Sequence, residues 1–194
     1  VVANFIEIIL DNLWAETIRE WLSLFSKNSI WEKIFSEKFT LINNPDLDWY
    51  TWNLVFDWEW VTQKTTTLFE RWVFLNKFYD YKNSIKEWVL DLGCSTVSNI
   101  ELKWDFSSCF LDNSDFLFTN LMAFHTVDTT TWKFSLSWEW YIIKNWIKKD
   151  FIKNISLTWD IINLFSNIHV IWDDFLDYWN FKIPSITFLN QKVV

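Results

Sequence analysis

Side chains that could act as metal ligands or nucleophiles are few in this chain and stand far apart. Its 194 residues include two histidines, His125 and His169, and two cysteines, Cys94 and Cys109. Their spacing matches neither a zinc-binding motif nor a disulfide framework. We expect both histidines to be structural, with His125 just before a strand and His169 at the start of one. Two thiols without close spacing are typical of a reducing compartment, which predicts a cytoplasmic protein.

An acidic pair and a hydroxyl pair are the remaining candidates for a functional site. Asp57 and Glu59 are two apart, a spacing that at the end of a strand places both carboxylates on one face. A solvated turn is the simpler interpretation, and an acidic wall of a cleft or partner interface is the more specific one. Ser95 and Thr96 follow Cys94, but no histidine or acidic residue stands at a spacing that predicts activation of this thiol. We predict no catalytic and no metal-binding residue, and the cleft or interface candidates are Asp57, Glu59, Ser95, Thr96 and His125.

Charge and hydropathy narrow the range of partners. The net charge is −8, and the 17 lysines and arginines form no basic stripe, so we expect no nucleic-acid surface. No run approaches the ~20 apolar residues that cross a bilayer, so we expect no membrane association. Residues 1–25 carry acidic residues and no basic leader, which argues against a signal peptide. A chain that starts with valine and has Met122 as its single methionine is expected to be a fragment.

Hydrophobic periodicity predicts an α+β fold with a mainly antiparallel sheet. Helical spacing of apolar residues is found in residues 3–25 and 81–89, and Asp160 is a suitable N-cap for a helix over residues 160–168. Residues 29–36 are expected to form a short helix or a turn, and residues 93–99 a loop. The connections are too short for crossover helices, which favours antiparallel pairing. Strands are predicted over residues 39–42, 53–56, 65–69, 73–78, 116–122, 133–137, 140–144, 147–151, 155–157, 169–171 and 186–189.

Tryptophan occupies positions where the local pattern calls for glycine. Residues 132–149 are typical of a β-hairpin, and the turn at Asn145-Trp146 needs a second residue that accepts positive φ, which glycine does easily and tryptophan poorly. The chain has 17 tryptophans and one glycine, whereas a domain of this size usually carries about 14 glycines. We hypothesise that most of these tryptophans are read from UGA codons that the organism translates as glycine. An aromatic-rich core or a designed chain is the alternative, and the codons in the gene distinguish the two.

Several blocks, read with glycine at these positions, resemble the C-terminal domain of the TldD/PmbA family, the modulators of DNA gyrase. The segment FDWEWV at residues 56–61 resembles the acidic glycine block of the family, and LFERWVFL at residues 68–75 resembles its hairpin. Ser95-Thr96 resembles its Ser-Thr-Gly-Asn loop, and residues 121–140 resemble a later block. The resemblance runs from the first helix to the C-terminus. It implies an extensive, partly closed antiparallel sheet with an N-terminal helix and short peripheral helices.

The resemblance also implies a function in peptide cleavage. In the catalytic half of the family, a helix carries His-Glu-x-x-x-His and a cysteine near the C-terminus completes a zinc site. Residues 8–21 of this chain contain no histidine, and no cysteine follows Cys109. The chain is therefore similar to the TldE/PmbA type, which implies no cofactor of its own, a TldD-like partner subunit that holds zinc, and a peptide substrate. Residues 1–194 would be the C-terminal domain of such a protein, with its N-terminal domain missing.

Two other interpretations stay open at the level of the sequence. The many tryptophans could form a stacking platform of an aromatic-rich β module that binds carbohydrate or peptide. The chain could also be a mistranslated product without stable function, because large rings in turns of positive φ cost stability. The codons at the tryptophan positions distinguish the aromatic-rich module from the family assignment. Cooperative melting of the chain would argue against a mistranslated product without a stable fold.

Overall fold

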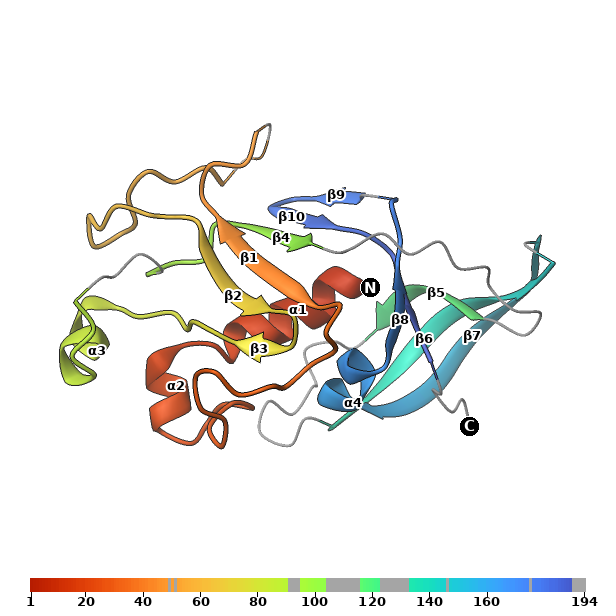
Figure 1. Ribbon diagram of the computed structural model, residues 1–194. Helices are drawn as coiled ribbons and strands as arrows, with labels where there is room; N and C mark the ends of the chain where they lie inside the picture. Colours follow the sequence, from red (N-terminus) through yellow and green to blue (C-terminus); the bar gives the residue numbers. More distant parts are fainter. Residues whose placement is uncertain are drawn as a thin grey trace.

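The computed structural model describes residues 1–48, 50, 52–90, 95–103, 116–122, 133–145, 147–174 and 176–189. Over these residues the chain has an α+β architecture in which short helices accompany three sheets (Figure 1). The helices are α1 (Val2–Asp11), α2 (Ala15–Arg19), α3 (Tyr81–Lys86) and α4 (Ile161–Ser166). The strands are β1 (Thr40–Asn44), β2 (Thr66–Glu70), β3 (Val73–Phe74), β4 (Asn99–Lys103), β5 (Phe116–Met122), β6 (Lys133–Lys144), β7 (Ile147–Asp160), β8 (Ile168–Ile171), β9 (Leu176–Tyr178), β10 (Phe181–Ile183) and β11 (Ile186–Phe188).

The sheets are mainly antiparallel, which confirms the predicted fold class. A six-stranded sheet has the order β3-β2-β1-β4-β10-β9, a three-stranded sheet has the order β5-β6-β7, and β11 pairs with β8. Among these named strands, the one parallel pair is β10 with β4. The β6–β7 hairpin follows the prediction, because Lys144 pairs with Ile147 and Asn145 adopts a φ of 51°. Trp146, the other turn residue, lies outside the described residues.

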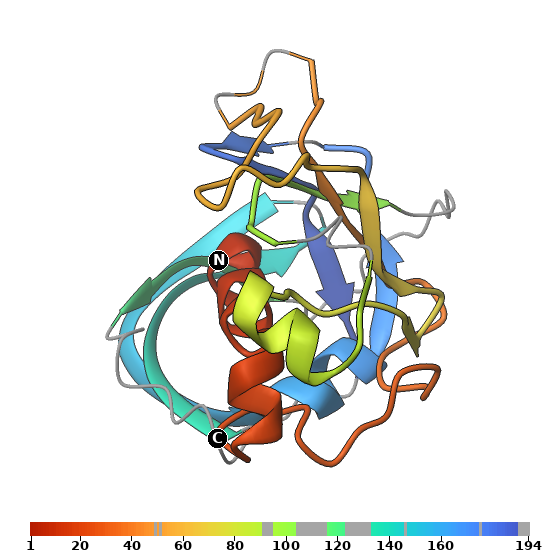
Figure 2. The same cartoon turned by 90° about the vertical axis from the view of Figure 1, so that its left-hand side faces the viewer.

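Helix α1 lies at the centre of the fold. Figure 2 shows the curved β5-β6-β7 sheet bending around this helix. Five α1 side chains are buried, and the pairs three or four residues apart among them form the core-facing stripe that the helical period requires: they are Phe5, Ile6, Ile8, Ile9 and Leu10. The ring of Phe5 lies 5.8 Å from the ring of Trp138 on β6 and 6.3 Å from that of Phe165 on α4. The helix thus joins the curved sheet to the rest of the core.

The helix predicted over residues 3–25 is divided into two by Asn12. This residue is buried, its Nδ2 donates to the Ile8 carbonyl at 2.8 Å, and its Oδ1 accepts from the Leu24 amide at 2.9 Å. A buried polar side chain that hydrogen-bonds to the backbone in this way competes with continuation of the helix. Residues 21–25 therefore fold back towards α1 instead of extending it, and the prediction of a single long helix was wrong.

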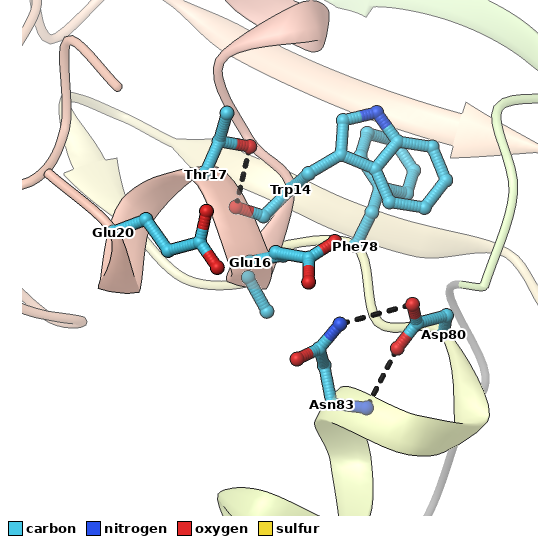
Figure 3. Close-up of a pocket in the computed structure, with 8 residues that line it drawn as sticks. Trp14, Glu16, Thr17, Glu20, Phe78, Asp80 and Asn83 are labelled. Atoms are coloured by element: carbon cyan, nitrogen blue, oxygen red, sulfur yellow. Dashed lines mark hydrogen bonds between the residues drawn. The ribbon is translucent and has the colours of Figure 1, made fainter. Parts of the chain in front are cut away.

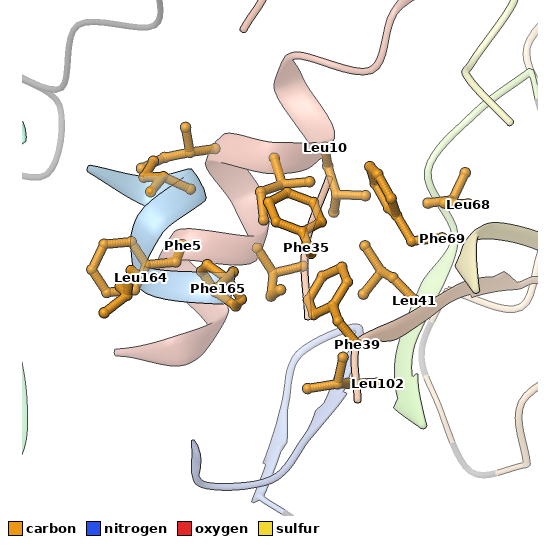
Figure 4. Packing of buried hydrophobic residues seen from close by; sticks show 14 of the residues in the cluster. Phe5, Leu10, Phe35, Phe39, Leu41, Leu68, Phe69, Leu102, Leu164 and Phe165 are labelled. Carbon is orange, nitrogen blue, oxygen red and sulfur yellow. The ribbon is translucent and has the colours of Figure 1, made fainter. Parts of the chain in front are cut away.

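A cluster of phenylalanines fills the space between α1, α4 and the six-stranded sheet (Figure 4). The ring of Phe69 on β2 lies 5.0 Å from that of Phe35 and 5.2 Å from that of Phe74, with the second pair stacked. Phe39 contacts Phe165 on α4 edge to face at 5.4 Å. Each such side chain contributes about 1.5–3 kcal/mol when fully buried. The phenylalanines therefore build this part of the core.

Some strand predictions differ from the structure. Residues 53–56 form no strand, and the strand predicted over residues 73–78 is limited to β3. Strands β6 and β7 are each continuous where two shorter strands were predicted, because bulges in their pairing absorb the interruptions of the pattern. Strands β4, β9 and β10 were not predicted. The last two have three residues each, which is too short for a periodic signal.

Six tryptophans adopt a left-handed backbone conformation. Their φ values lie between 56° and 76°, a region that costs a residue with a β-carbon about 1–2 kcal/mol. Five of the six side chains are exposed, between 68% and 88% of their area, so burial does not offset this cost. These positions suit glycine better than tryptophan. The six residues are Trp21, Trp31, Trp60, Trp72, Trp88 and Trp179.

Two tryptophans on β6 are, in contrast, part of the interior. Trp138 and Trp140 are 1% and 2% exposed. The Trp138 ring contacts Phe118 edge to face at 4.8 Å, and the Trp140 ring stacks on Phe116 at 5.0 Å. The Nε1 of Trp140 has no hydrogen-bond partner within the described part of the chain. These rings therefore fill space but leave an indole N–H unsatisfied, which is unusual for a buried tryptophan.

Replacing Glu7 of α1 by glutamine is expected to stabilise the protein slightly at neutral pH. Burial of its carboxyl and the charge of Asp11 one turn later both raise the pKa of Glu7 above its ordinary value. Like charges at this spacing cost about 0.2–0.5 kcal/mol. A raised folded-state pKa favours the fold below the ordinary glutamate pKa, and this contribution is lost as the pH rises through the folded value. Urea unfolding should therefore give a more stable variant at pH 7 and no difference at pH 3.

Candidate functional site

The acidic pair lies in a tight turn next to the six-stranded sheet. Phe56 and Thr62 form an isolated bridge, and between them the Asp57 amide donates to the Val61 carbonyl at 3.0 Å. The Oδ1 atom of Asp57 accepts from the amides of Glu59 at 2.9 Å and Val61 at 2.8 Å. Asp57 thus acts as an Asx turn residue that holds the loop closed.

The two carboxylates of this turn bind different partners. Glu59 accepts from the Tyr81 amide at the start of α3 through Oε2, at 2.7 Å. The Oδ2 atom of Asp57 accepts from the hydroxyl of Ser95. The simpler interpretation of this pair, a turn, agrees with the structure, whereas the strand predicted to end at residue 56 does not form. The acidic turn therefore connects α3 to the loop that precedes β4.

Ser95 and Asp57 come together although they are 38 residues apart in the sequence. The Nε2 of Gln63 donates to the Ser95 hydroxyl at 2.6 Å and to the Val61 carbonyl at 3.3 Å. Ser95 and Gln63 are both buried. A carboxylate is a weak base towards a hydroxyl, and no imidazole is present among these contacts. The arrangement therefore anchors a loop rather than activating a nucleophile.

Asn43 on β1 holds the next part of the same loop. Its side chain is fully buried. Its Nδ2 donates to the Thr96 carbonyl at 3.0 Å, and its Oδ1 accepts from the Ser98 amide at 2.8 Å and the Ser98 hydroxyl at 2.9 Å. Asn180 donates to the Ser98 carbonyl at 2.8 Å. Residues 95–98 are thus fixed against β1 and against the turn before β10.

Replacing Asn43 by alanine is expected to loosen this loop. The change leaves the Ser98 amide and hydroxyl buried without their acceptor, which costs about 1–3 kcal/mol. Urea unfolding should report this loss, and hydrogen exchange of the Ser98 amide should accelerate. Asn76→Ala removes one exposed hydrogen bond to the Thr67 carbonyl and is the matched control. Equal stability of the two variants would contradict the role of Asn43.

The predicted site residues are only partly brought together. Asp57, Glu59, Ser95 and the Thr96 backbone belong to one network, whereas His125 lies outside the described residues. His169 is on β8, where its carbonyl accepts from the Lys38 ammonium. Asn43 and Gln63 also belong to this network, although the sequence did not predict them as site residues. An asparagine inside a strand-like pattern is the signal that could have identified Asn43.

The centre of the fold does not suit a zinc ion. Helix α1 contacts β10, and the buried residues of these two elements, among them Ile6, Ile9 and Phe181, are apolar. Zinc requires imidazole, thiolate or carboxylate ligands. Within the described parts of the chain, no group of three or more such side chains could hold a metal ion.

None of the helices in these parts has the length and apolar character needed to cross a bilayer.

A family comparison identifies the chain. The model of the PmbA/TldA metallopeptidase C-terminal domain matches residues 1–194. The chain belongs to this family. The resemblance to the TldD/PmbA family that the sequence predicted is thereby confirmed. No curated protein matches the chain by sequence.

Solved structures show the same fold as this PmbA/TldA domain. A protein from Thermotoga maritima, described as a modulator of a DNA gyrase, has a TM-score of 0.81 and 17% identity over 94% of this chain. A similarly described protein from Bacteroides thetaiotaomicron has a TM-score of 0.78 and 20% identity over 96%. TldE from Thermococcus kodakarensis has a TM-score of 0.79 and 15% identity over 94%. The match covers 45%, 43% and 45% of those chains, so this domain corresponds to less than half of each.

Proposed function

We propose that this chain is the zinc-less subunit of a two-subunit metallopeptidase. Its partner is a TldD-like subunit that carries the zinc site, and the complex cleaves or trims unfolded peptides in the cytoplasm. The observation that carries the proposal is a contrast within the chain: it belongs to a metallopeptidase family, yet its central helix has the sequence VANFIEIILD, without a histidine. A likeness to the fold of TldE supports the choice of subunit type.

The acidic turn is the part of the chain that we propose for the cleft wall or the partner interface. Val55 and Phe56, just before the turn, are 68% and 49% exposed. Aromatic residues such as phenylalanine are enriched at the core of protein-binding surfaces, and polar groups surround them at the rim. Glu59 and Asp57 also fix the turn to α3 and to Ser95, so the surface is held in one shape. A preorganised surface loses less entropy on binding.

Co-expression with a zinc-bearing relative tests the proposed role. We expect a complex by size-exclusion chromatography with light scattering, zinc in the partner only, and cleavage of an unfolded peptide by the complex. Zinc that stays with this chain when it is purified alone would contradict the proposal. Failure to associate with any zinc-bearing relative would contradict it as well.

A double variant tests the acidic turn within this complex. Asp57→Asn with Glu59→Gln removes both charges, and we expect weaker assembly or slower cleavage, with the chain still folded by circular dichroism. The matched control is Glu70→Gln, which removes an exposed carboxylate at the end of β2. Unchanged assembly and cleavage in the double variant would exclude this turn from the interface and the cleft.

We also propose that most tryptophans of this chain are glycines in the protein of the organism. The support is conformational, because six tryptophans have φ values that a residue without a β-carbon adopts easily. Sequencing the gene is the direct test. UGA at these six codons is the expected result, and UGG at most of them would end the proposal.

An aromatic binding module is the second candidate function. It is favoured by Trp58 and Trp60, which are 93% and 83% exposed in the same turn. Exposed rings of this kind stack on sugars or on peptide side chains. Quenching or a shift of tryptophan fluorescence by an oligosaccharide or a peptide, lost in a Trp58→Ala variant, would favour this function over the peptidase subunit.

A further inference from the structure

The tip of the β6–β7 hairpin, residues 144–153, is the most basic stretch of the chain. Four of the 17 lysines and arginines stand in it, beside Asp150 as its one acidic residue. Figure 1 shows this tip at the end of the molecule opposite α3. Since the chain as a whole has a net charge of −8, the tip differs in charge from most of the protein. Its lysines, all exposed, are Lys144, Lys148, Lys149 and Lys153.

Two aromatic rings hold two of these lysines. Tyr141 and Phe151 pair across the hairpin, and their rings lie 4.7 Å apart. The Nζ of Lys148 lies 5.1 Å from the centre of the Tyr141 ring, and the Nζ of Lys153 lies 5.0 Å from that of Phe151. A ring face attracts a cation through its negative electrostatic potential. Lys153 also approaches Glu139 at 3.9 Å, the long limit of an ion pair. The two ammonium groups are therefore held beside the same pair of rings.

Strand β7 is an edge of its sheet, but its features disfavour the addition of another strand. In the order β5-β6-β7 it pairs with β6, and no described strand pairs with it on the other side. The β6–β7 pairing has two register shifts, one of them between Tyr141 and Ile143. Bulges and lysines on an edge both oppose pairing with a further strand. We therefore expect a ligand to contact the side chains of the tip rather than to extend the sheet.

The charge and the apolar surface of the tip favour a polypeptide over a nucleic acid. Proteins that bind nucleic acid neutralise several phosphates and are usually basic, whereas this chain is acidic overall. Stacking of a base needs a free ring face, and the rings of Tyr141 and Phe151 already face each other and a lysine each. Ile147 and Phe151 are 56% and 41% exposed between the lysines. Apolar side chains of a polypeptide can cover both.

The pocket between α2 and α3 has the opposite charge. Glu16, Glu20 and Asp80 line it (Figure 3), and its lining residues in the described chain include no lysine, arginine or histidine. An acidic ligand is repelled there and attracted at the tip of the hairpin. Charge therefore directs such a ligand to one end of the molecule.

We propose that the tip of the β6–β7 hairpin binds acidic segments of unfolded polypeptide, in which aspartate or glutamate stands next to apolar residues. The carboxylates pair with the four lysine ammonium groups, which are charge-assisted hydrogen-bond donors. The apolar side chains pack on Ile147 and Phe151 and remove their exposed surface from water. That such segments are substrates of the complex rests on the proposed function, whereas their binding to the tip does not.

Fluorescence anisotropy with labelled probes tests this surface on the full chain alone. The probes are a peptide of three Glu-Glu-Leu-Ser repeats, its counterpart with glutamine in place of glutamate, and a thymidine oligonucleotide of the same net charge. We expect saturable binding of the acidic peptide that weakens as salt is added, and no binding of the glutamine peptide. Equal binding of the glutamine peptide, tighter binding of the oligonucleotide, or no saturable binding of the acidic peptide would overturn the proposal.

Two double variants locate the binding. Lys148→Gln with Lys153→Gln should weaken binding of the acidic peptide about two- to fivefold for each lysine, as expected for exposed ion pairs. Lys27→Gln with Lys133→Gln is the matched control, because it removes the same charge from exposed lysines before β1 and at the far end of β6. We expect nearly unchanged affinity in the control. Equal losses in both double variants would show that net charge and not the tip governs binding, and would overturn the proposal.

The result is independent of the proposed subunit role. No partner subunit is present in the binding measurement, so a failure of the acidic peptide to bind would leave the assembly with a zinc-bearing relative untouched. A failure of that assembly would likewise leave binding at the hairpin tip intact.

Discussion

Replacing the six tryptophans of positive φ by glycine is expected to raise the melting temperature by about 10 °C. Substitution by glycine relieves about 1–2 kcal/mol of backbone strain at each site. The greater conformational entropy of glycine in the unfolded chain offsets about 0.5–1 kcal/mol of this gain. Six sites together then contribute about 3–6 kcal/mol, and about 2–4 °C follows from each kcal/mol in a chain of this length. Thermal unfolding followed by circular dichroism measures the difference.

Two controls separate backbone strain from loss of the rings. Trp58 is 93% exposed and lacks positive φ, so Trp58→Gly should not raise the melting temperature. Alanine at the six positions also removes the rings but keeps a β-carbon, so most of the strain should remain. A gain from alanine equal to that from glycine, or no gain from glycine, would show that backbone conformation is not the cause.

The same substitution at Trp138 is expected to have the opposite effect. Trp138→Gly should destabilise the protein by about 4–6 kcal/mol, because it opens a cavity in the interior and puts glycine into a strand. The indole is 1% exposed and contacts Phe5 of α1 and Phe118 of β5. Its loss would weaken the attachment of the curved sheet to α1. Urea unfolding of a chain that is otherwise unchanged measures this cost.

Trp60→Gly is the matched comparison for Trp138→Gly. The side chain changes in the same way, but Trp60 is 83% exposed and has a φ of 61°. We expect a gain of about 0.5–1 kcal/mol there. A small effect at Trp138 would mean that its ring does not contribute to packing and that β6 tolerates glycine there. Such tolerance would be required if Trp138 and Trp140 were both glycines in the protein of the organism.

Local sequence patterns were sufficient for many elements of this fold. Strand β5 has the predicted bounds, α4 begins after the predicted N-cap Asp160, whose Oδ1 accepts from the Asn163 amide at 3.0 Å, and α3 and the β6–β7 hairpin are where the pattern put them. Periodicity, capping and turn preferences act over a few residues. The six strained tryptophans also follow this rule, since the conflict between residue and turn is local.

The candidate site depended on long-range pairing instead. The Asp57 carboxylate accepts from Ser95, whereas the Glu59 carboxylate accepts from the Tyr81 amide. Ser95 lies in the loop before β4, and β4 pairs with β1 and β10 in the sheet. The order of strands in a sheet depends on contacts between residues far apart in the chain, which no local pattern encodes. The same holds for α2 and α3, because the bridge between Trp14, just before α2, and Phe78, before α3, joins segments far apart in the chain.

The sequence by itself determined the family, the absence of a histidine pair on the central helix, and the positions where tryptophan occurs in a local pattern that favours glycine. These properties depend only on residue types and their spacing. The tertiary structure alone decided which carboxylates meet which donors, such as the Asp57 carboxylate and the Ser95 hydroxyl. The physical reason is that burial and hydrogen bonding between distant segments are fixed only when the sheets and helices pack together.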